Sequence, residues 1–317
     1  VNEHRPSTKQ VVEAISGRDN LGVVAGISYL NYNHRDLKEI GDYLEAGLIR
    51  GLKFYPGYEP FYPNDIRLKV VYDMAIEFDV PVMFHSGDTY APNGKVKYSH
   101  PIHIDDLAVD YPALKIVICH VGNPWIKDCM EVVYKNKNVY ADVSGLVLGD
   151  FSEKFEKYVK NEIEEMITYA GDPKYLLYGT DWPISNMKSY LKFMAQLDIT
   201  ENKKELIMWE NAAKLYKIDI EELNPRILKV WSRYLHPEEF AIFDTTSIFD
   251  LTVAWTIKEA LFKLNTKTGI DFKNDLRIKS KEGNTFLCEM RSEDGFQTVK
   301  METCAYKNLI ISYNVNK

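Results

Sequence analysis

The first two thirds of the chain repeat one pattern, in which a short, mostly apolar run precedes a segment whose apolar residues recur with helical spacing. Continuous apolar runs are typical of strands buried on both faces of a parallel sheet. Six such runs are present, at residues 21–30, 49–55, 80–85, 115–120, 138–143 and 175–181. Because each is followed by helical sequence, the pattern predicts βαβ architecture, in which eight units would close a TIM-type (β/α)8 barrel.

The pattern changes after Glu221. Residues 225–235 and 248–264 have the apolar spacing of helices, and the rest of the sequence alternates between apolar and polar positions. Four strands are predicted at 275–279, 285–291, 296–304 and 308–314, with hairpin turns at 283–284 and 294–295. We therefore expect an α/β chain of two domains, a βα barrel in residues 1–217 and a small α+β lobe in residues 218–317.

Charge and composition narrow the class of partner. The chain of 317 residues has 39 Lys and Arg against 46 Asp and Glu, a net charge of -7, which argues against a nucleic-acid-binding protein. No apolar run approaches the roughly 18 residues that a membrane span needs. The four cysteines lack Cys-x-x-Cys spacing and the chain opens without a signal-peptide pattern, so we expect a cytoplasmic protein with reduced thiols and a small-molecule or protein substrate.

Polar residues stand near the ends of the predicted strands. Catalytic groups of βα barrels project from the C-terminal ends of strands, where the βα loops converge. Two imidazoles and a carboxylate there can hold a divalent cation that activates water or polarises a carbonyl. A lone histidine at a strand end is more often structural, but several at one edge favour a site. The candidates are His85, His120, Asp142 and Asp181, with Lys53, Tyr55 and His100 as substrate contacts, although Lys53 also fits a salt-bridged interior position.

Several segments resemble one known family. RGLKFYP at 50–56, PVMFHSG at 81–87, YPALKIVICHVG at 111–122, LYGTDWP at 177–183 and ENAA at 210–213 occur in the order expected of metal-dependent amidohydrolases. The branch that the sequence resembles contains TIM-barrel decarboxylases and hydrolases related to aminocarboxymuconate-semialdehyde decarboxylase. The resemblance covers about residues 1–217.

The resemblance implies hydrolysis of a C–N or ester bond, or non-oxidative decarboxylation, with zinc or manganese in the barrel. It implies that His85 is a metal ligand, that His120 acts on water or substrate, and that Asp181 is a ligand or proton acceptor. The family also has a His-x-His pair on its first strand, and this sequence has no His-x-His. The six predicted strands correspond to the family's third to eighth, so we expect an incomplete barrel that binds metal poorly.

A second set of acidic residues lies beyond the barrel. Asp219 and Glu221 are spaced to share one face of a strand, and Trp255, Glu259 and Lys263 share one stripe of a helix. Three carboxylates that converge suit Mg²⁺, and a lysine nearby suits a phosphate bridged by that metal. An isolated Asp-x-Glu pair is usually a solvated one, so the pattern has weight only in combination with the helix.

The combined segments resemble the 4′-phosphopantetheinyl transferase superfamily over about residues 218–317. IDIEELNPRI at 218–227, YLHPEE at 234–239, WTIKEA at 255–260 and TGIDF at 268–272 carry the resemblance. It implies transfer of phosphopantetheine from coenzyme A to a serine of an acyl carrier protein. Mg²⁺ would be bound by Asp219, Glu221 and Glu259, with Glu259 helping to deprotonate the serine, and phosphate would be contacted by Lys258 and Lys263. Lys217 stands where the superfamily has glycine, and only the C-terminal lobe of the two-lobe type is matched.

Three hypotheses follow. The first is that the barrel is a metal-dependent hydrolase or decarboxylase, and this hypothesis rests on the larger part of the chain. Alternatively, the main activity is Mg²⁺-dependent holo-acyl-carrier-protein synthesis, or the chain is an inactive fusion remnant.

Overall fold

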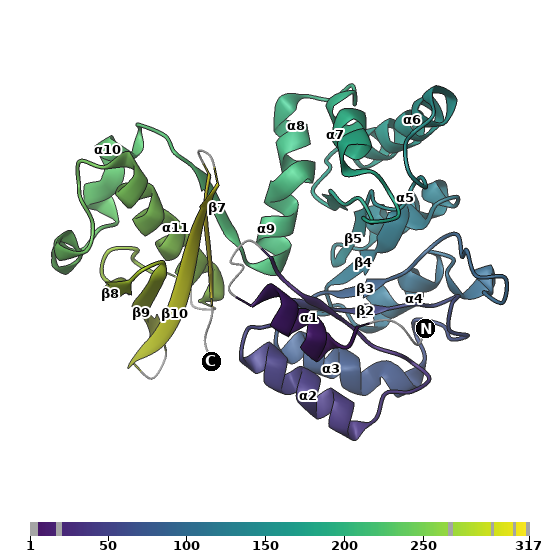
Figure 1. Cartoon of the computed structure of the whole chain (residues 1–317), viewed down its shortest axis with the longest axis horizontal. Helices are drawn as coiled ribbons and strands as arrows, with labels where there is room; N and C mark the ends of the chain where they lie inside the picture. The colour runs from purple at the N-terminus through teal and green to yellow at the C-terminus, as the bar shows by residue number, and fades with distance from the viewer. Residues whose placement is uncertain (1–5, 17–20, 266–268, 293–294, 307–308, 315–317) are drawn as a thin grey trace. The chain divides into compact units, whose positions relative to one another are not determined.

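The computed structural model describes residues 6–16, 21–265, 269–292, 295–306 and 309–314; of these, residues 219–222, 306 and 309 are described by their backbone alone. The chain separates into two compact units. The first includes Val24–Gly41 and Arg50–Ala212, and the second includes Ala213–Lys317. Each is treated by itself below (Figure 1).

The first unit is built on a six-stranded parallel sheet whose strands lie in chain order. The predicted α/β fold of TIM-barrel type is confirmed, and among the described residues the first and last strands each pair on one side only. Every apolar run contains a strand, but the paired segments are shorter than predicted. The strands are β1 (Val24–Gly26), β2 (Gly51–Phe54), β3 (Val82–Phe84), β4 (Ile116–Ile118), β5 (Val139–Asp142) and β6 (Leu176–Leu177).

Two strand ends differ from the sequence prediction in a way that affects the site. The pairing of β4 stops at Ile118, and His120 lies beyond it in the short turn η3 (Cys119–Gly122) with φ 62°. The pairing of β6 stops at Leu177, so Asp181 stands on the following loop, also with a positive φ of 61°. The apolar run marks the buried strand, whereas hydrogen bonding ends where the backbone turns away from its neighbour.

Helices follow the strands as the alternation predicts. Residues Ser7 and Gln10 form a capping box, in which the side chain of each accepts a hydrogen bond from the backbone N–H of the other. The helices and helical turns that precede β7 in the chain are α1 (Thr8–Ile15), α2 (His34–Glu45), η1 (Ile66–Leu68), α3 (Lys69–Glu77), η2 (Val96–Tyr98), α4 (His103–Asp110), α5 (Ile126–Lys135), α6 (Glu153–Ala170), α7 (Met187–Ala195), α8 (Glu201–Glu205), η4 (Leu206–Glu210) and α9 (Asn211–Tyr216). None of the described helices in either unit is long and apolar enough to span a bilayer.

The core of this unit is the sheet itself. Leu52, Phe54, Val82, Phe84 and Ile116 are completely buried. Burying one such side chain contributes about 1.5–3 kcal/mol, so these strands are the most strongly determined part of the fold. The residues that directly follow them are thereby held in place at one edge of the sheet.

The second unit is a five-stranded antiparallel sheet with one long helix, α11 (Ile248–Leu264), packed on it (Figure 1). The strand order is β7-β11-β10-β9-β8. The strands are β7 (Asp219–Glu222), β8 (Leu276–Glu282), β9 (Thr285–Ser292), β10 (Gly295–Tyr306) and β11 (Leu309–Asn314). All four predicted C-terminal strands are present. The helix predicted at 225–235 is instead a short α10 (Ile227–Val230) followed by the turn η5 (Trp231–Arg233), and η6 (Pro237–Ala241) comes next.

The core of the second unit lies between α11 and one face of the sheet. Its buried members come from the helix and from alternate positions of the strands: Leu251, Ala254, Ile257, Leu261, Ile278, Phe286, Cys288, Val299 and Met301. Because strand side chains alternate between faces, this set shows which residues of each strand point toward α11.

Candidate functional site

Four chemically active side chains stand at neighbouring ends of the parallel strands. Lys53 is on β2, His85 directly follows β3, His120 follows β4 in η3, and Asp142 is the last residue of β5. The rings of His85 and His120 meet edge to face with centroids 5.2 Å apart. The order of the strands in the sheet therefore brings together residues that are far apart in the sequence.

His120 is held by hydrogen bonds from both its backbone and its ring. Its N–H donates to Oδ1 of Asp142 at 3.0 Å, and its Nδ1 lies 3.1 Å from the carbonyl oxygen of Ser144 and 2.9 Å from the Ser144 hydroxyl. A carbonyl oxygen only accepts, so Nδ1 carries the proton of the neutral ring. The Ser144 hydroxyl in turn donates to Asp142. This leaves the lone pair on Nε2 of His120, which has no hydrogen-bond partner among the described residues.

Gly145 makes this arrangement sterically possible. It has φ +61°, and a Cβ added there would lie 2.4 Å from Nδ1 of His120. A larger residue would have both a strained backbone and a clash with the ring. Sequence reasoning missed Ser144 and Gly145, although a Ser-Gly pair just after a strand that ends in Asp142 is a readable signal for a tight turn at the edge of a sheet.

His85 is almost fully buried. Its Nε2 lies 2.8 Å from the carbonyl oxygen of Asp88, so Nε2 is the protonated nitrogen, and the Tyr58 ring packs edge to face against it. Burial, together with the neighbouring His120 imidazole and the Lys53 ammonium group, lowers the pKa of His85 to about 2. His85 is therefore neutral, with its lone pair on Nδ1, at any ordinary pH.

The remaining charges of the cluster balance one another. Burial lowers the pKa of His120, and the negative charge of Asp142 offsets part of that effect. Burial would raise the pKa of Asp142, but His120, Lys53 and the Ser144 hydrogen bond bring it below its usual value. Burial likewise opposes the charge on Lys53, whereas Cys119 and Asp142 raise its pKa overall. The ammonium group of Lys53 also donates to Cys119 Sγ at 2.6 Å. The cluster thus holds one cation and one anion beside two neutral imidazoles.

The other barrel residues singled out by the sequence are Asp181, His100 and Tyr55. The Asp181 side chain is exposed and makes no hydrogen bond or ion pair with a described residue, although its charge raises the pKa of His120. His100 accepts from the N–H of Ile102 at 3.2 Å and packs against Trp125. Tyr55 has its ring centroid 5.5 Å from Nζ of Lys53.

The donor set does not fit a resident metal ion. In the part of the chain that the structure describes, no three His, Cys, Asp or Glu side chains are grouped so that they could hold one. The two candidate ligands, His85 and Asp181, are a buried imidazole engaged at Nε2 and an exposed carboxylate on a loop. Catalytic zinc sites use three protein ligands.

In the second unit, the acidic strand is present, but its side chains lie outside the described parts. Asp219 and Glu221 are on β7, opposite Ser312 and Ile310 of β11, so their two-residue spacing does place them on one face. Glu259 on α11 is half-buried, and its carboxylate pairs with Lys263 at 3.7 Å. Whether the three carboxylates converge stays a prediction.

Lys258 has a different position from the one the sequence suggested. Its side chain is 0% exposed, and its ammonium group pairs with Glu239 at 2.8 Å. It also donates to the carbonyl oxygens of Tyr234, Leu276 and Phe272 at 2.7, 2.8 and 3.1 Å. The sequence analysis expected Lys258 to contact phosphate, but Lys258 faces the core of the lobe because it lies on the buried side of α11. Lys263, the other expected phosphate contact, is exposed.

Glu239 completes a buried network around Lys258. Its carboxylate accepts from the N–H of His236 at 2.6 Å and from the N–H of Ile278 at 2.7 Å. A carboxylate and an ammonium buried together are tolerated only when their hydrogen-bonding groups are satisfied. The network therefore joins η6, α11 and β8.

Comparison with known proteins identifies the family. Residues 18–218 match the family model described as amidohydrolase. The chain belongs to the amidohydrolase family. Residues 218–312 match the model of the 4′-phosphopantetheinyl transferase superfamily. Both resemblances seen in the sequence are thereby confirmed, and they meet at the start of β7.

Individual relatives resemble the amidohydrolase part. A γ-resorcylate decarboxylase of Polaromonas sp. is 27% identical over a stretch covering 34% of this chain and 36% of that protein. The chain thus spans about a third of the length of this curated relative.

Solved structures show the same fold. An uncharacterised TIM-barrel protein from Bordetella bronchiseptica has a TM-score of 0.54 at 24% identity, covering 66% of this chain and 71% of that one. A 2,6-dihydroxybenzoate decarboxylase from Rhizobium has a TM-score of 0.51 at 17% identity, covering 65% and 74%. A dihydroxybenzoic acid decarboxylase from Polaromonas sp., with bound manganese and 2-nitroresorcinol, has a TM-score of 0.50 at 18% identity, covering 65% and 72%.

The neutral state of His85 makes the stability of the amidohydrolase unit sensitive to acid. The unfolded chain protonates this histidine near pH 6.5, whereas the folded chain does not until about pH 2. Below pH 6.5 the unfolded state therefore binds more protons, and the free energy of unfolding falls as the pH falls, by up to about 1.4 kcal/mol per pH unit. We expect His85→Asn to lose less stability than the wild type between pH 6.5 and 5, in urea denaturation with a chelator present. Equal pH dependence of the two proteins would show that His85 is accessible to protons in the folded state.

The Lys258–Glu239 pair is expected to stabilise the lobe. Lys258→Met leaves the Glu239 carboxylate buried without its cation, which costs about 3–5 kcal/mol. Lys263→Met, on the same helix but exposed, should change stability by less than about 0.5 kcal/mol. Hydrogen exchange of the α11 amides measures both effects within the lobe. Similar exchange rates in the two variants would rule out the stabilising role of the pair.

Proposed function

We propose that the amidohydrolase unit catalyses proton-transfer chemistry on a small carboxylated substrate, with non-oxidative decarboxylation of an aromatic acid as the first candidate and hydrolysis of a C–N or ester bond as the second. The observation that supports this is the arrangement of His120, Ser144 and Asp142, which leaves Nε2 of a neutral imidazole as a free base. The similarity to γ-resorcylate decarboxylase favours the decarboxylation.

His120 suits both directions of proton transfer. Its neutral ring accepts a proton at Nε2 from a substrate hydroxyl or from water. The resulting imidazolium is a stronger acid than free histidine, because burial lowers its pKa, and the nearby Asp142 carboxylate stabilises it while it exists. In decarboxylation that proton replaces the departing CO₂ on carbon, and in hydrolysis it protonates the leaving group.

Lys53 supplies the charge that a carboxylated substrate needs. Its ammonium group is the cation of the cluster, and it lies beside two uncharged rings. An anion entering this edge of the sheet is attracted by Lys53 in surroundings of low dielectric constant, where the attraction is stronger than in water. In this proposal Tyr55 and His100 also contact the substrate. Tyr55 lies next to Lys53, and His100 lies on the segment that connects β3 to α4.

Manganese is the ion to test, because the similar Polaromonas structure contains it. The residues that the family resemblance marks as ligands are His85 and Asp181, which are two donors where a catalytic site uses three. We infer that the unit holds manganese or zinc weakly, and no step above depends on it.

Removal of the His120 imidazole tests the proposal. We expect His120→Asn to lower CO₂ release from 2,6-dihydroxybenzoate by about 10²–10⁴-fold, the usual contribution of a general acid–base residue. His34→Asn, at an exposed position on α2, is the matched control and should keep wild-type activity. The assay is run with and without added Mn²⁺, and the metal content is measured after dialysis. Equal turnover by the two variants under both conditions would remove His120 from the reaction.

The second unit has its own candidate function, Mg²⁺-dependent phosphopantetheinyl transfer from coenzyme A to an acyl carrier protein. The match of residues 218–312 to that superfamily supports it. So does the placement of Asp219 and Glu221 on a strand that packs against α11, the helix that carries Glu259 and Lys263. In this proposal the three carboxylates bind Mg²⁺ and Lys263 contacts the phosphate.

Glu259→Gln keeps the size of the side chain but removes its charge. If the three carboxylates bind Mg²⁺, this change should abolish transfer to apo carrier protein, because a neutral amide is a poorer ligand for a hard cation. Glu282→Gln, at an exposed position on β8, serves as the control. Transfer would be followed by the mass of the carrier protein, and an unchanged rate in Glu259→Gln would exclude Glu259 from the metal site.

A further inference from the structure

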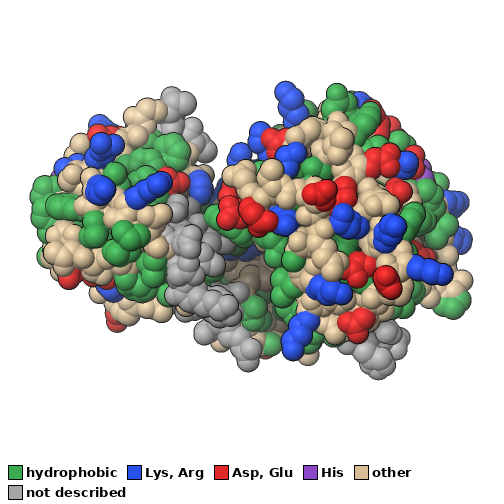
Figure 2. Space-filling view, turned by 90° about the horizontal axis from the view of Figure 1, so that it is seen from above, with side chains coloured by type: hydrophobic (Ala, Val, Ile, Leu, Met, Phe, Trp, Pro, Cys, Tyr) green, Lys and Arg blue, Asp and Glu red, His purple; other side chains and the backbone are tan. Residues whose placement is uncertain are grey.

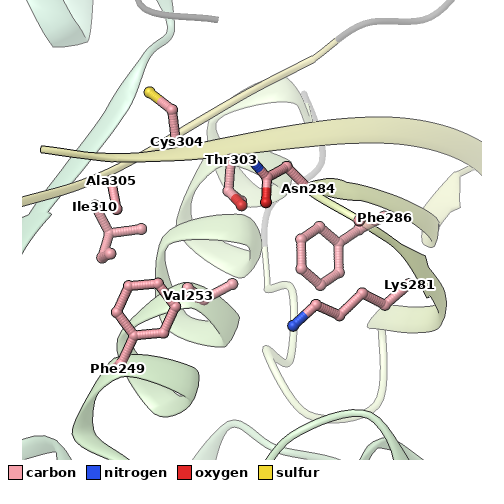
Figure 3. Close-up of a pocket in the computed structure, with 10 residues that line it drawn as sticks. Phe249, Val253, Lys281, Asn284, Phe286, Thr303, Cys304, Ala305 and Ile310 are labelled. Carbon is pink, nitrogen blue, oxygen red and sulfur yellow. The ribbon is translucent and has the colours of Figure 1, made fainter.

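A pocket of about 220 Å³ lies in the second unit, between the first turns of α11 and the hairpin end of the sheet (Figure 3). It is separate from the predicted magnesium and phosphate ligands, since neither Glu259 nor Lys263 lines it. Helix, hairpin and two further strands contribute to it, so it is a feature of the folded lobe. Its main lining residues are Phe249, Val253, Lys281, Asn284, Phe286 and Thr303.

One side of the pocket is apolar. Phe249 and Val253 are one helical turn apart on α11, and Phe286 and Ile310 face them from β9 and β11 (Figure 3). Phe249 is 44% exposed, although it stands beside the core. These side chains form a surface on which a ring or a short hydrocarbon chain would be removed from water.

The other side contains hydroxyl and amide groups without partners. Thr303 on β10 is only 6% exposed, and Ser312, directly opposite it on β11, is 0% exposed. Both side chains lie on the face of the sheet that is otherwise apolar. Among the described residues, the hydroxyls of Ser312 and Thr303 have no hydrogen-bond partner, and the exposed Asn284 makes no side-chain hydrogen bond. Hydroxyl groups that are buried, as those of Ser312 and Thr303 are, destabilise the fold unless something bonds to them. Their presence beneath α11 is therefore informative.

Lys281 adds a positive charge to the same side. It is paired with Phe286 across β8 and β9, so both side chains leave the same face of the sheet, and its Nζ lies 5.6 Å from the Phe286 ring. The side chain reaches toward the space between the sheet and α11 (Figure 3). Lys281 makes no ion pair with a described carboxylate.

We propose that this pocket binds a small amphipathic carboxylate. Its apolar body packs on Phe249, Val253 and Phe286, and its carboxylate accepts hydrogen bonds from the Lys281 ammonium group and the Asn284 amide. Thr303 bonds to a carboxylate oxygen or to a ring hydroxyl. A dry cavity of about 150 Å³ takes up benzene, so the larger volume here suits a single ring with one carboxyl group.

The groups on the pocket wall decide between classes of ligand. Lys281 is exposed, so it can pair with a ligand carboxylate at the mouth of the pocket, which a neutral ligand does not offer. A second carboxylate on the same ligand would meet only apolar side chains. A cation would be repelled by Lys281. A monocarboxylate satisfies the ammonium, amide and hydroxyl groups together with the apolar wall.

Calorimetric titration of the full chain tests the proposal with benzoate and hexanoate as acids and benzamide as the neutral match of benzoate. We expect saturable binding of the acids, and at least about tenfold weaker binding of benzoate in Lys281→Met, because a hydrogen bond to a charged group is lost. Benzamide binding should change little. Lys279→Met is the control, since Lys279 is on the same strand but pairs with Glu238 and Glu289 outside the pocket.

A second variant separates this pocket from the edge of the parallel sheet, where benzoate could also bind. Val253→Phe fills the pocket with an apolar ring, so it should block both benzoate and benzamide in a chain whose thermal unfolding remains cooperative. Benzoate affinity that is unchanged in Lys281→Met and in Val253→Phe would place the ligand elsewhere and overturn the proposal. Absence of saturable binding by either acid in the wild type would overturn it as well.

Discussion

The buried carboxylate of Asp142 is the constraint on which the edge of the parallel sheet depends. A carboxylate inside a protein must be surrounded by donors or it loses its charge. Here the N–H of His120, the N–H of Ser144 and the Ser144 hydroxyl all bond to its Oδ1. Those bonds require the backbone to turn sharply after β4 and again after β5. The turn at His120, the tautomer of its ring and the need for glycine at position 145 all follow from satisfying one carboxylate.

The second unit obeys the same rule with a different solution. Glu239 is buried beside Lys258, and two backbone N–H groups complete its hydrogen bonds. The ammonium group bonds to the backbone carbonyl of Tyr234, which precedes α11 in the chain, and to those of Phe272 and Leu276, which follow it. In the parallel sheet, the buried Asp142 carboxylate holds His120, whose Nε2 keeps a free lone pair. In the second unit, the hydrogen-bonding groups of Lys258 and Glu239 are all bonded to other groups of the lobe. For that reason we place proton transfer at His120 and assign Lys258 to stability.

The sequence predicts some of these features well and others poorly, for physical reasons. Apolar runs identify all six parallel strands, because strands covered on both faces contain few polar residues. The same runs overestimate strand length at 115–120 and 175–181, since they do not show where pairing stops. Helical spacing places residues 248–264 on α11, but Lys258 and Glu259 are adjacent and point in different directions. Which of them is buried depends on the sheet beneath, and no local pattern contains that information. The bond between His120 and Ser144 joins the segments that follow β4 and β5, so it too is invisible in a local pattern.

The polar groups of the two units differ in what remains unsatisfied. At the edge of the parallel sheet nearly all of them are bonded within the protein, so that group of residues is preformed, and a substrate meets one prepared base and one cation. In the pocket beside α11, the nearly buried Thr303 hydroxyl has no partner among the described residues, nor has the buried Ser312 hydroxyl opposite it, and the exposed Lys281 makes no ion pair with a described carboxylate. Buried hydroxyl groups at positions 303 and 312 weaken the lobe when nothing bonds to them, compared with apolar residues that would fill the space. The proposed ligand would bond to Thr303 and pair with Lys281, and this is the physical reason for assigning a binding role to the pocket.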